Sequence, residues 1–157
     1  MCTGVRFADA AGNLYFGRNL DWCESYGEGV VITPRGASIP TQFLGSLSPE
    51  HACVGMGIVV GGVPCYFDCA NEAGLAIAGL NFPGYAQFAE APEKGAVNVA
   101  AYEFPLWVAA SFSTVAEVRK ALKDVVIVAK ALSEGYGLAQ LHFLVAFSYT
   151  HLTLPTT

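Results

Sequence analysis

The chain has 157 residues, which is enough for one domain with a hydrophobic core but too few for two domains of typical size. Hydrophobic residues make up 54% of it and charged residues 13%, which excludes a disordered chain and indicates apolar surfaces that a partner subunit, a ligand or further chain would cover. The net charge of -5 and the scattered basic residues argue against nucleic-acid binding.

Targeting and cysteine signals indicate a cytoplasmic protein. No basic segment followed by an apolar run opens the chain, so no secretory signal is visible. No apolar run reaches the roughly 18 residues of a membrane-spanning helix. In a reducing compartment the odd set of five cysteines is expected to be free: Cys2, Cys23, Cys53, Cys65 and Cys69. Cys65 and Cys69 are expected on the same face of a strand, but no histidine lies nearby, and we assign no metal or cofactor.

The N-terminal region is predicted to form a β-hairpin. Residues 3–8 read as a strand, residues 9–13 supply turn chemistry, and residues 14–18 return as a second strand. Counting outward from the middle of the turn pairs Cys2 with Leu20. The hairpin therefore carries the residues after its second strand back to the level of Cys2.

Four further strands are predicted from β-branched and apolar runs: residues 28–34, 52–60, 63–69 and 75–81. Gly61-Gly62 is a hairpin turn signal between the second and third of these. The last three runs are apolar nearly throughout, which favours a sheet buried on both faces. Residues 35–50 are rich in Pro, Ser, Thr and Gly and are predicted to form a long loop.

The C-terminal part is predicted to be mainly helical. Apolar residues recur with a helical period from Asn98 onward, and Thr114 to Glu117 fits a capping box that starts a second helix. Residues 141–147 are predicted to form another strand. Residues 148–157 carry no formal charge and match no pattern before them, so we interpret them as a non-native tail, with a genuine polar tail as the alternative.

Cys2 is the first candidate for chemistry. It becomes the N-terminal residue once Met1 is removed, and it then carries both a thiol and a free amine. An α-amino group with a reference pKa of about 7.7–8.0 can act as the base for such a nucleophile. The alternative is an ordinary buried cysteine, because cysteine is among the most buried residue types.

Arg18, Asp21 and Asn81 are the candidates that accompany Cys2. A cation such as Arg18 next to a thiol favours the thiolate, and the carboxylate of Asp21 can orient the amine. Asn81 follows a predicted strand and can donate a hydrogen bond to an oxyanion. Each also has a purely structural interpretation: Arg18 and Asp21 as a surface ion pair, and Asn81 as the start of a turn.

Four segments resemble the choloylglycine hydrolase family, which comprises bile salt hydrolases and penicillin V acylases. They are Met1-Cys2-Thr3-Gly4, residues 15–22 with Gly17-Arg18-Asn19-Leu20-Asp21, residues 31–36, and residues 71–85 with Asn81-Phe82-Pro83-Gly84-Tyr85. The similarity continues to about Ala146, so we expect residues 1–147 to be the N-terminal part of a choloylglycine hydrolase-like domain.

The resemblance implies an α+β fold of the N-terminal-nucleophile hydrolases, with two sheets between helix layers in an αββα order, here incomplete. It implies that Cys2 attacks an amide carbonyl and that an acyl-thioester is then hydrolysed. By position, Arg18 and Asp21 hold the two functional groups of Cys2, and Asn81 contributes to the oxyanion site.

The expected substrates are bile salts conjugated to glycine or taurine, with penicillin V or another N-acyl amide as the alternative. Leu20, Phe82 and Tyr85 are the expected substrate-binding residues, and Phe43 is a further candidate for the acyl pocket. The family pattern has an asparagine and an arginine beyond residue 157. The competing hypotheses are therefore an inactive, truncated chain and a non-catalytic thiol-containing binding module. Family members are commonly homotetramers, so the resemblance, and nothing else in the sequence, implies a homotetrameric parent enzyme.

Overall fold

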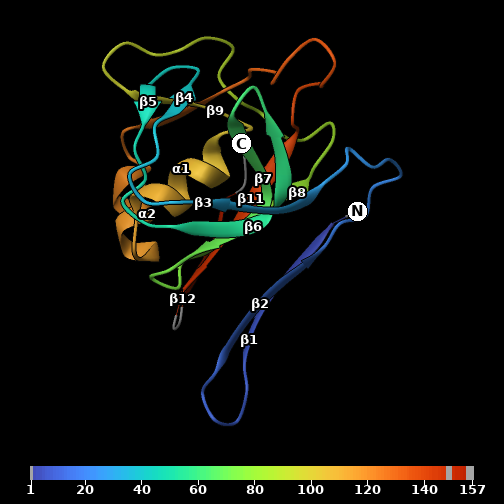
Figure 1. Cartoon of the computed structure of the whole chain (residues 1–157), viewed down its shortest axis with the longest axis vertical. Helices are drawn as coiled ribbons and strands as arrows, with labels where there is room; N and C mark the ends of the chain where they lie inside the picture. The colour runs from blue at the N-terminus through green and yellow to red at the C-terminus, as the bar shows by residue number, and fades with distance from the viewer. Residues whose placement is uncertain (1, 148–149, 155–157) are drawn as a thin grey trace.

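The centre of the molecule is an antiparallel six-stranded sheet (Figure 1), and the computed structural model describes residues 2–147 and 150–154. The strand order is β12-β11-β8-β7-β6-β3. The bounds are β3 Gly29–Thr33, β6 Cys53–Val60, β7 Val63–Asn71, β8 Ala76–Asn81, β11 Leu141–Phe147 and β12 Thr150–Leu154. All the strands predicted for this sheet are present. Gly61 and Gly62 join β6 to β7 with φ angles of 58° and 81°, as the predicted two-residue turn requires.

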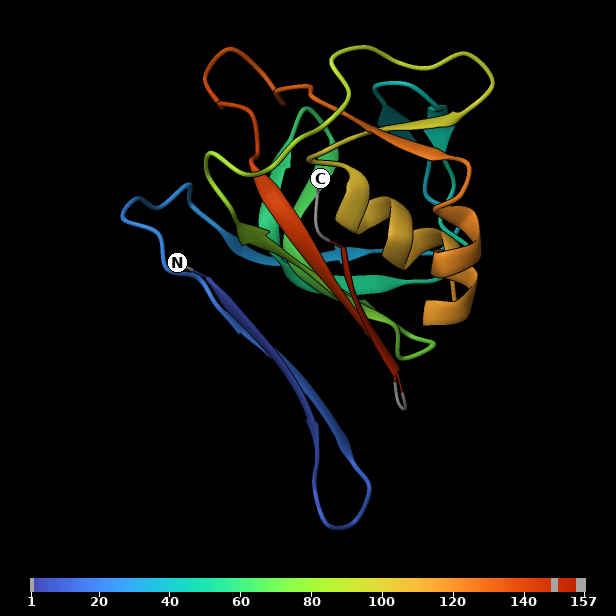
Figure 2. The same cartoon turned by 180° about the vertical axis from the view of Figure 1, so that it is seen from behind.

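Two helices cover one face of this sheet (Figure 2): α1, Phe104–Ser111, and α2, Val115–Ala121. The fully buried side chains of Ile77, Phe104 and Phe143 belong to the core between the sheet and the helices. The capping box predicted at Thr114 is confirmed. The Thr114 side chain accepts a hydrogen bond from the Glu117 backbone N–H, and the Glu117 side chain accepts one from the Thr114 backbone N–H. The main core of the protein therefore lies on the helical side of the sheet.

The opposite face of the sheet has only a small buried cluster. Cys2 packs there with Ala78, Leu80 and Leu144, and Phe16 of the N-terminal hairpin lies against them. The prediction of a sheet buried on both faces is correct for β8, whose residues before Asn81 are all buried. It is wrong for much of β6, because the described residues place no layer over its second face and leave the side chains of Val54 and Met56 exposed. The neighbouring β3, to which this prediction did not apply, likewise exposes Val30 and Ile32.

The N-terminal hairpin extends away from the rest of the molecule (Figures 1 and 2) and consists of β1, Thr3–Ala8, and β2, Leu14–Asn19. Thr3 pairs with Asn19 in the symmetric register that the sequence predicts. Val5 and Phe7 of β1 are both about half exposed. Only the end of the hairpin nearest Cys2 contributes to the cluster on the sheet.

Two sequence predictions need correction. Residues 97–100, predicted to begin a helix from Asn98, form strand β9, Val97–Ala100, which pairs in parallel with β10, Val125–Val128. Residues 35–50, predicted to be a loop, contain the short hairpin of β4, Ile39–Thr41, and β5, Gly45–Leu47. Both differences have a tertiary cause, since β9 finds its partner more than 20 residues away and Ile39 of β4 is buried in the core.

A β-bulge changes which way the side chains of β7 point. Met56 pairs with Asp68 and Gly57 pairs with Tyr66, so Phe67 has no partner residue on β6. Cys69 then packs in the core beneath the helices, whereas Cys65 lines a cavity on the other side. The prediction that Cys65 and Cys69 share a face is wrong, because alternation along a strand is interrupted by the extra residue.

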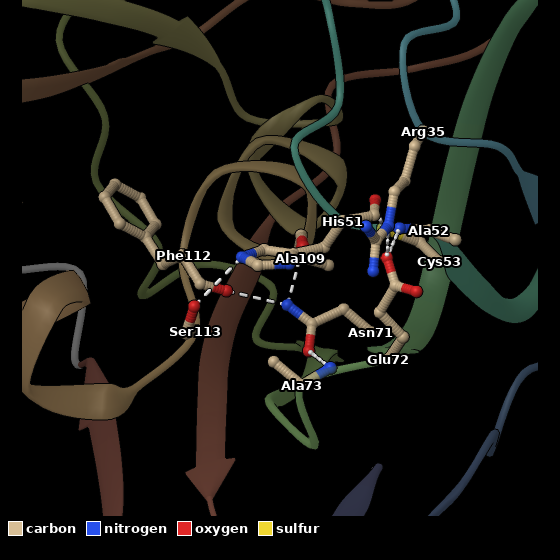
Figure 3. A network of polar contacts seen from close by, with 10 residues as sticks. All are labelled: Arg35, His51, Ala52, Cys53, Asn71, Glu72, Ala73, Ala109, Phe112 and Ser113. Carbon is tan, nitrogen blue, oxygen red and sulfur yellow. Dashed lines mark hydrogen bonds and ion pairs between the residues drawn. The ribbon is translucent and has the colours of Figure 1, made fainter.

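Asn71 connects the end of β7 to helix α1 (Figure 3). Its side-chain amide donates to the carbonyl oxygens of Ala109 and Phe112 at 2.8 and 2.7 Å. Its side-chain oxygen accepts from the N–H groups of Ala73 and Leu75 at 3.1 and 3.0 Å. This buried side chain shapes the turn into β8 and holds the C-terminal end of the helix on the sheet.

The C-terminal residues are described in part. Thr150–Leu154 forms β12, which pairs antiparallel with β11, while residues 148–149 and 155–157 lie outside the described residues. This pairing does not test whether residues 148–157 are native, and that interpretation stays a prediction. Within the part of the chain that is described, no helix is long and apolar enough to cross a membrane.

Candidate active site

Cys2 lies immediately before β1, on the side of the sheet opposite the helices. Its side chain is 7% exposed and packs against apolar residues of β8 and β11. The N–H of the next residue, Thr3, donates to the Asn19 side chain at 2.5 Å, which ties the start of β1 to the end of β2. The hairpin register therefore fixes Cys2 next to the sheet.

Arg18, near the end of β2, is directed at the same side of the sheet. Its Nη2 donates to the carbonyl oxygen of Gly79 on β8 at 2.6 Å. Its Nε lies 3.5 Å from the Asp68 carboxylate on β7, and the side chain is only 7% exposed. The structure thus anchors a buried cation on two neighbouring strands, where an ion pair is screened far less than at a surface.

Cys2, Arg18 and Asn81 line one cavity of about 670 Å³. Most of the other lining residues are apolar or aromatic. They come from β6 and β7, from the segments around residues 20–26 and 132–141, and from positions just after β8 and just before α1: Leu20, Trp22, Tyr26, Ile58, Cys65, Tyr66, Phe67, Pro83, Tyr102, Leu132, Tyr136, Leu138, Ala139 and Leu141. An apolar cavity of this size with a few polar groups is typical of a small-molecule site.

Aromatic contacts join the two segments at the cavity. The Tyr26 ring lies 6.2 Å from that of Phe67 and 5.8 Å from that of Tyr136. Trp22 donates from Nε1 to the Tyr26 hydroxyl at 2.9 Å. The Tyr26 and Phe67 rings meet edge to face and the Tyr26 and Tyr136 rings are tilted, at distances where aromatic pairs attract each other. They give the cavity one wall from the N-terminal third of the chain and another from the segment before β11.

The cavity wall is nearly uncharged. Arg18 carries the only charged side chain among the described lining residues. Burial, followed by the charge of Glu103, raises the pKa of the Cys65 thiol to about 12. The same two causes raise the pKa of the Tyr102 phenol. Both groups are therefore neutral at physiological pH, so the charge of Arg18 acts in an environment of low polarity.

The other predicted residues have different positions. Asn81 ends β8 and pairs with Leu141, and Leu20 is 41% exposed at the cavity. Asp21 is exposed and lies outside the lining set. Phe82 and Tyr85 also lie outside it: their ring centroids are 5.2 Å apart, and Tyr85 is 70% exposed. Phe43, the further candidate, is likewise absent from the lining.

Sequence reasoning did not identify Asp68 or the aromatic residues Trp22, Tyr26 and Tyr102 as parts of this site. Asp68 had a usable signal, since it is the one charged residue in the otherwise apolar run of residues 63–69. The aromatic residues had none, because isolated aromatic residues are as common in cores as in binding sites. Among the described residues, no group of three or more His, Cys, Asp or Glu side chains is arranged to hold a metal ion.

Solved structures with this architecture identify the class of fold. The mutant C2A conjugated bile acid hydrolase from Clostridium perfringens superposes with a TM-score of 0.94 and 33% identity, covering 100% of this chain and 48% of that one. Penicillin V acylase from Agrobacterium tumefaciens superposes with a TM-score of 0.70 at 19% identity, a likeness of fold alone. The protein has the α+β fold of the N-terminal-nucleophile hydrolases.

The sequence comparisons identify the family. The model of the linear amide C–N hydrolases, choloylglycine hydrolase family, matches residues 2–151. The conjugated bile acid hydrolase of Lactobacillus gasseri is 52% identical over 93% of this chain and 46% of its own length. The bile salt hydrolase/transferase of Bifidobacterium longum is 53% identical over 92% of this chain and 46% of its own length. The chain belongs to the choloylglycine hydrolase family, and it spans about half the length of these relatives.

Proposed function

We propose that the protein containing this chain hydrolyses the amide bond of bile salts conjugated to glycine or taurine. The observation that carries the proposal is that Cys2 and Arg18 line the same apolar cavity. Conjugated bile salts combine a rigid apolar steroid with a charged end, and the cavity combines apolar walls with one cation. The relatives named as bile acid or bile salt hydrolases support the same substrate class.

The proposed mechanism begins with removal of Met1, which frees the amine of Cys2 to act as base. The sulfur attacks the amide carbonyl carbon, and Asn81 donates a hydrogen bond to the developing oxyanion. The carbon–nitrogen bond then breaks, and glycine or taurine leaves with the proton taken from the thiol. Water hydrolyses the thioester, which releases the bile acid and restores the thiol. Arg18 stabilises the thiolate, and Asp21 orients the amine.

In this proposal, Leu20 supplies part of the cavity wall for the acyl group. Phe82 and Tyr85 form an aromatic pair next to Pro83, and Pro83 lines the cavity. The aromatic residues Trp22, Tyr26 and Phe67 join the substrate-binding set on the strength of their position at the cavity. Cytoplasmic location and a homotetrameric parent enzyme remain proposals. The five cysteines, all free among the described residues, support the first of these.

The test is hydrolysis by the complete gene product. We expect release of taurine from taurocholate and of glycine from glycocholate, measured by mass spectrometry, with Cys2→Ala reducing the rate at least about 10⁴-fold, on the scale of other nucleophile deletions. The intact mass of the protein checks that Met1 has been removed. A Cys2→Ala variant that retains its rate would contradict the mechanism. Faster turnover of penicillin V than of either bile salt would favour the acylase alternative, and no turnover of any amide would favour the inactive or binding alternatives.

A further inference from the structure

We propose that Asp68 is a positioning residue for this site, which holds the guanidinium of Arg18 in place beside the cavity. The kinetic test of this inference rests on the proposed function. The structural test does not, because the position of Arg18 can be observed without knowing the reaction. Asp68 is the acidic side chain paired with Arg18 in the structure, with the Nε and Oδ2 atoms 3.5 Å apart. It reaches Arg18 from β7, a different strand from that of Gly79, the other anchor.

The bulge at Phe67 is what brings Asp68 to this side of the sheet. In an uninterrupted strand, Tyr66 and Asp68 point to the same face. Here Tyr66 packs in the core beneath the helices, while Asp68 pairs with Arg18 on the opposite side. Bulges often occur beside active sites, where they redirect a side chain. The extra residue therefore has an identifiable effect. It directs the Asp68 carboxylate to the side of the sheet where Arg18 lies, whereas an uninterrupted strand would direct it into the apolar core.

Two glycines on β6 make room for the bulge. A Cβ atom at Gly55 would lie 2.0 Å from the carbonyl oxygen of Asp68, and one at Gly57 would lie 2.4 Å from that of Cys65. Neither atom fits without movement of the β7 backbone. The close approach of the two strands, and with it the orientation of Asp68, depends on glycine at both positions. The carboxylate is thus placed by backbone packing and not by the preference of a flexible side chain.

Burial raises the pKa of the Asp68 carboxyl overall, and two contacts partly offset this effect: the nearby Arg18 and a hydrogen bond from the Met56 backbone both lower the pKa. The carboxylate therefore bridges the backbone of β6 and the cation of β2. The Gly79 carbonyl satisfies Nη2 but carries no net charge, and Nε has no hydrogen-bond partner in the described structure. Without Asp68 the buried cation would lose the negative charge that balances it.

The geometric test is the crystal structure of the Asp68→Asn variant of the complete gene product. This substitution removes the charge and keeps the shape. We expect the guanidinium of Arg18 to leave the Gly79 carbonyl, while the backbone of β7 stays in place. Arg18 in an unchanged position would overturn the proposal, whatever the enzyme proves to hydrolyse.

The kinetic test is a double-mutant cycle with Arg18→Leu, measured on the amide that the wild-type enzyme turns over fastest. Displacing a group at a reacting centre by about 1 Å can cost on the order of 10²-fold, so we expect Asp68→Asn to lower kcat/KM by 10- to 100-fold, mainly through kcat. Asp68→Glu should restore part of it. In the Arg18→Leu background we expect Asp68→Asn to cause no further loss, since the two residues act as a unit.

A matched control is Glu72→Gln. Glu72 also pairs with the Nε of an arginine, Arg35, but both side chains are exposed and neither residue lines the cavity. We expect this variant to keep the kcat and KM of the wild type. Two results would overturn the positioning role. One is an equal loss of kcat/KM from Asp68→Asn in the wild-type and Arg18→Leu backgrounds, and the other is an Asp68→Asn enzyme as active as the wild type. A wild-type enzyme that is active on penicillin V but not on bile salts would overturn the substrate proposal alone.

Discussion

Burial separates the cysteines of this protein into groups with different reactivity. Burial and then the charge of Glu72 raise the pKa of the Cys53 thiol to about 11, and burial and then the charge of Glu103 raise that of Cys65 to about 12. The pKa of Cys69 is also raised well above its usual value, first by burial. Cys23 is exposed. Thiolates are the reactive species, so Cys53, Cys65 and Cys69, whose pKa values are raised, are structural thiols.

This difference predicts the pattern of alkylation at pH 8. With the proposed nucleophile replaced in a Cys2→Ala background, we expect iodoacetamide to modify Cys23 while Cys53, Cys65 and Cys69 remain unmodified in the native protein, as measured by peptide mass spectrometry. Unfolding in urea serves as the control, because it should expose all four. Rapid modification of Cys65 in the folded state would mean that its side of the cavity is open to solvent.

Asn71 shows how one side chain fixes the relation between elements. Its amide joins the end of β7, the turn into β8 and the end of α1 through four hydrogen bonds, and Figure 3 shows those to Ala73, Ala109 and Phe112. Asn98 makes a similar set of contacts with the Glu93 backbone and the Ala96 carbonyl, but in a more exposed segment. If the Asn98 side chain is removed, water can hydrogen-bond to the backbone groups that it contacted. The backbone groups around the buried Asn71 are less accessible to water.

We therefore predict that Asn71→Ala destabilises the protein by more than Asn98→Ala does. Leaving buried backbone groups without partners costs about 1–3 kcal/mol for each group, so the loss at Asn71 should be several kcal/mol and that at Asn98 about 1 kcal/mol or less. Urea unfolding monitored by circular dichroism measures both. Equal losses would show that the turn at residues 71–75 forms without the Asn71 side chain.

The whole molecule has one covered and one largely open sheet face. On β3, Val30 and Ile32 are 71% and 70% exposed, and Val54 and Met56 continue the patch on β6. Val31, between the first two, packs toward the core beneath the helices. Contiguous apolar surface of this kind promotes association with other apolar surfaces. Part of the exposed apolar surface anticipated from the composition thus lies on this face, and another part lies on the N-terminal hairpin, where Val5 and Phe7 are about half exposed.

This asymmetry predicts different effects of substitution by threonine at two neighbouring positions of the 157-residue chain. We expect Ile32→Thr to reduce binding of the dye ANS and self-association, with a change in unfolding free energy within about 0.5 kcal/mol, as for other surface substitutions. Val31→Thr should instead destabilise the chain by about 1–2 kcal/mol, since it introduces a hydroxyl group at a partly buried position that packs against the core. Fluorescence titration and light scattering distinguish the two. Unchanged dye binding in Ile32→Thr would contradict the assignment of this face as the apolar surface.

Local signals in the sequence determined several elements of this protein correctly. The turn residues 9–13 and the strands around them specify the register that pairs Thr3 with Asn19, Gly61-Gly62 specifies the β6–β7 turn, and Thr114 specifies the start of α2. The motifs around Cys2 and residues 71–85 also identified the family that the comparisons then showed. Each of these signals depends on residues close together in the chain, or on a pattern long enough to be specific.

Only the tertiary structure decided what faces the candidate site. Arg18 meets Gly79 across 61 residues, and the side of the sheet on which Asp68 lies depends on one extra residue in β7. The strand formed by residues 97–100 likewise depends on a distant partner, which the local helical pattern does not indicate. The physical reason is the same in each case: strand alternation is a local rule, whereas bulges, strand order and cavity walls follow from how distant segments pack.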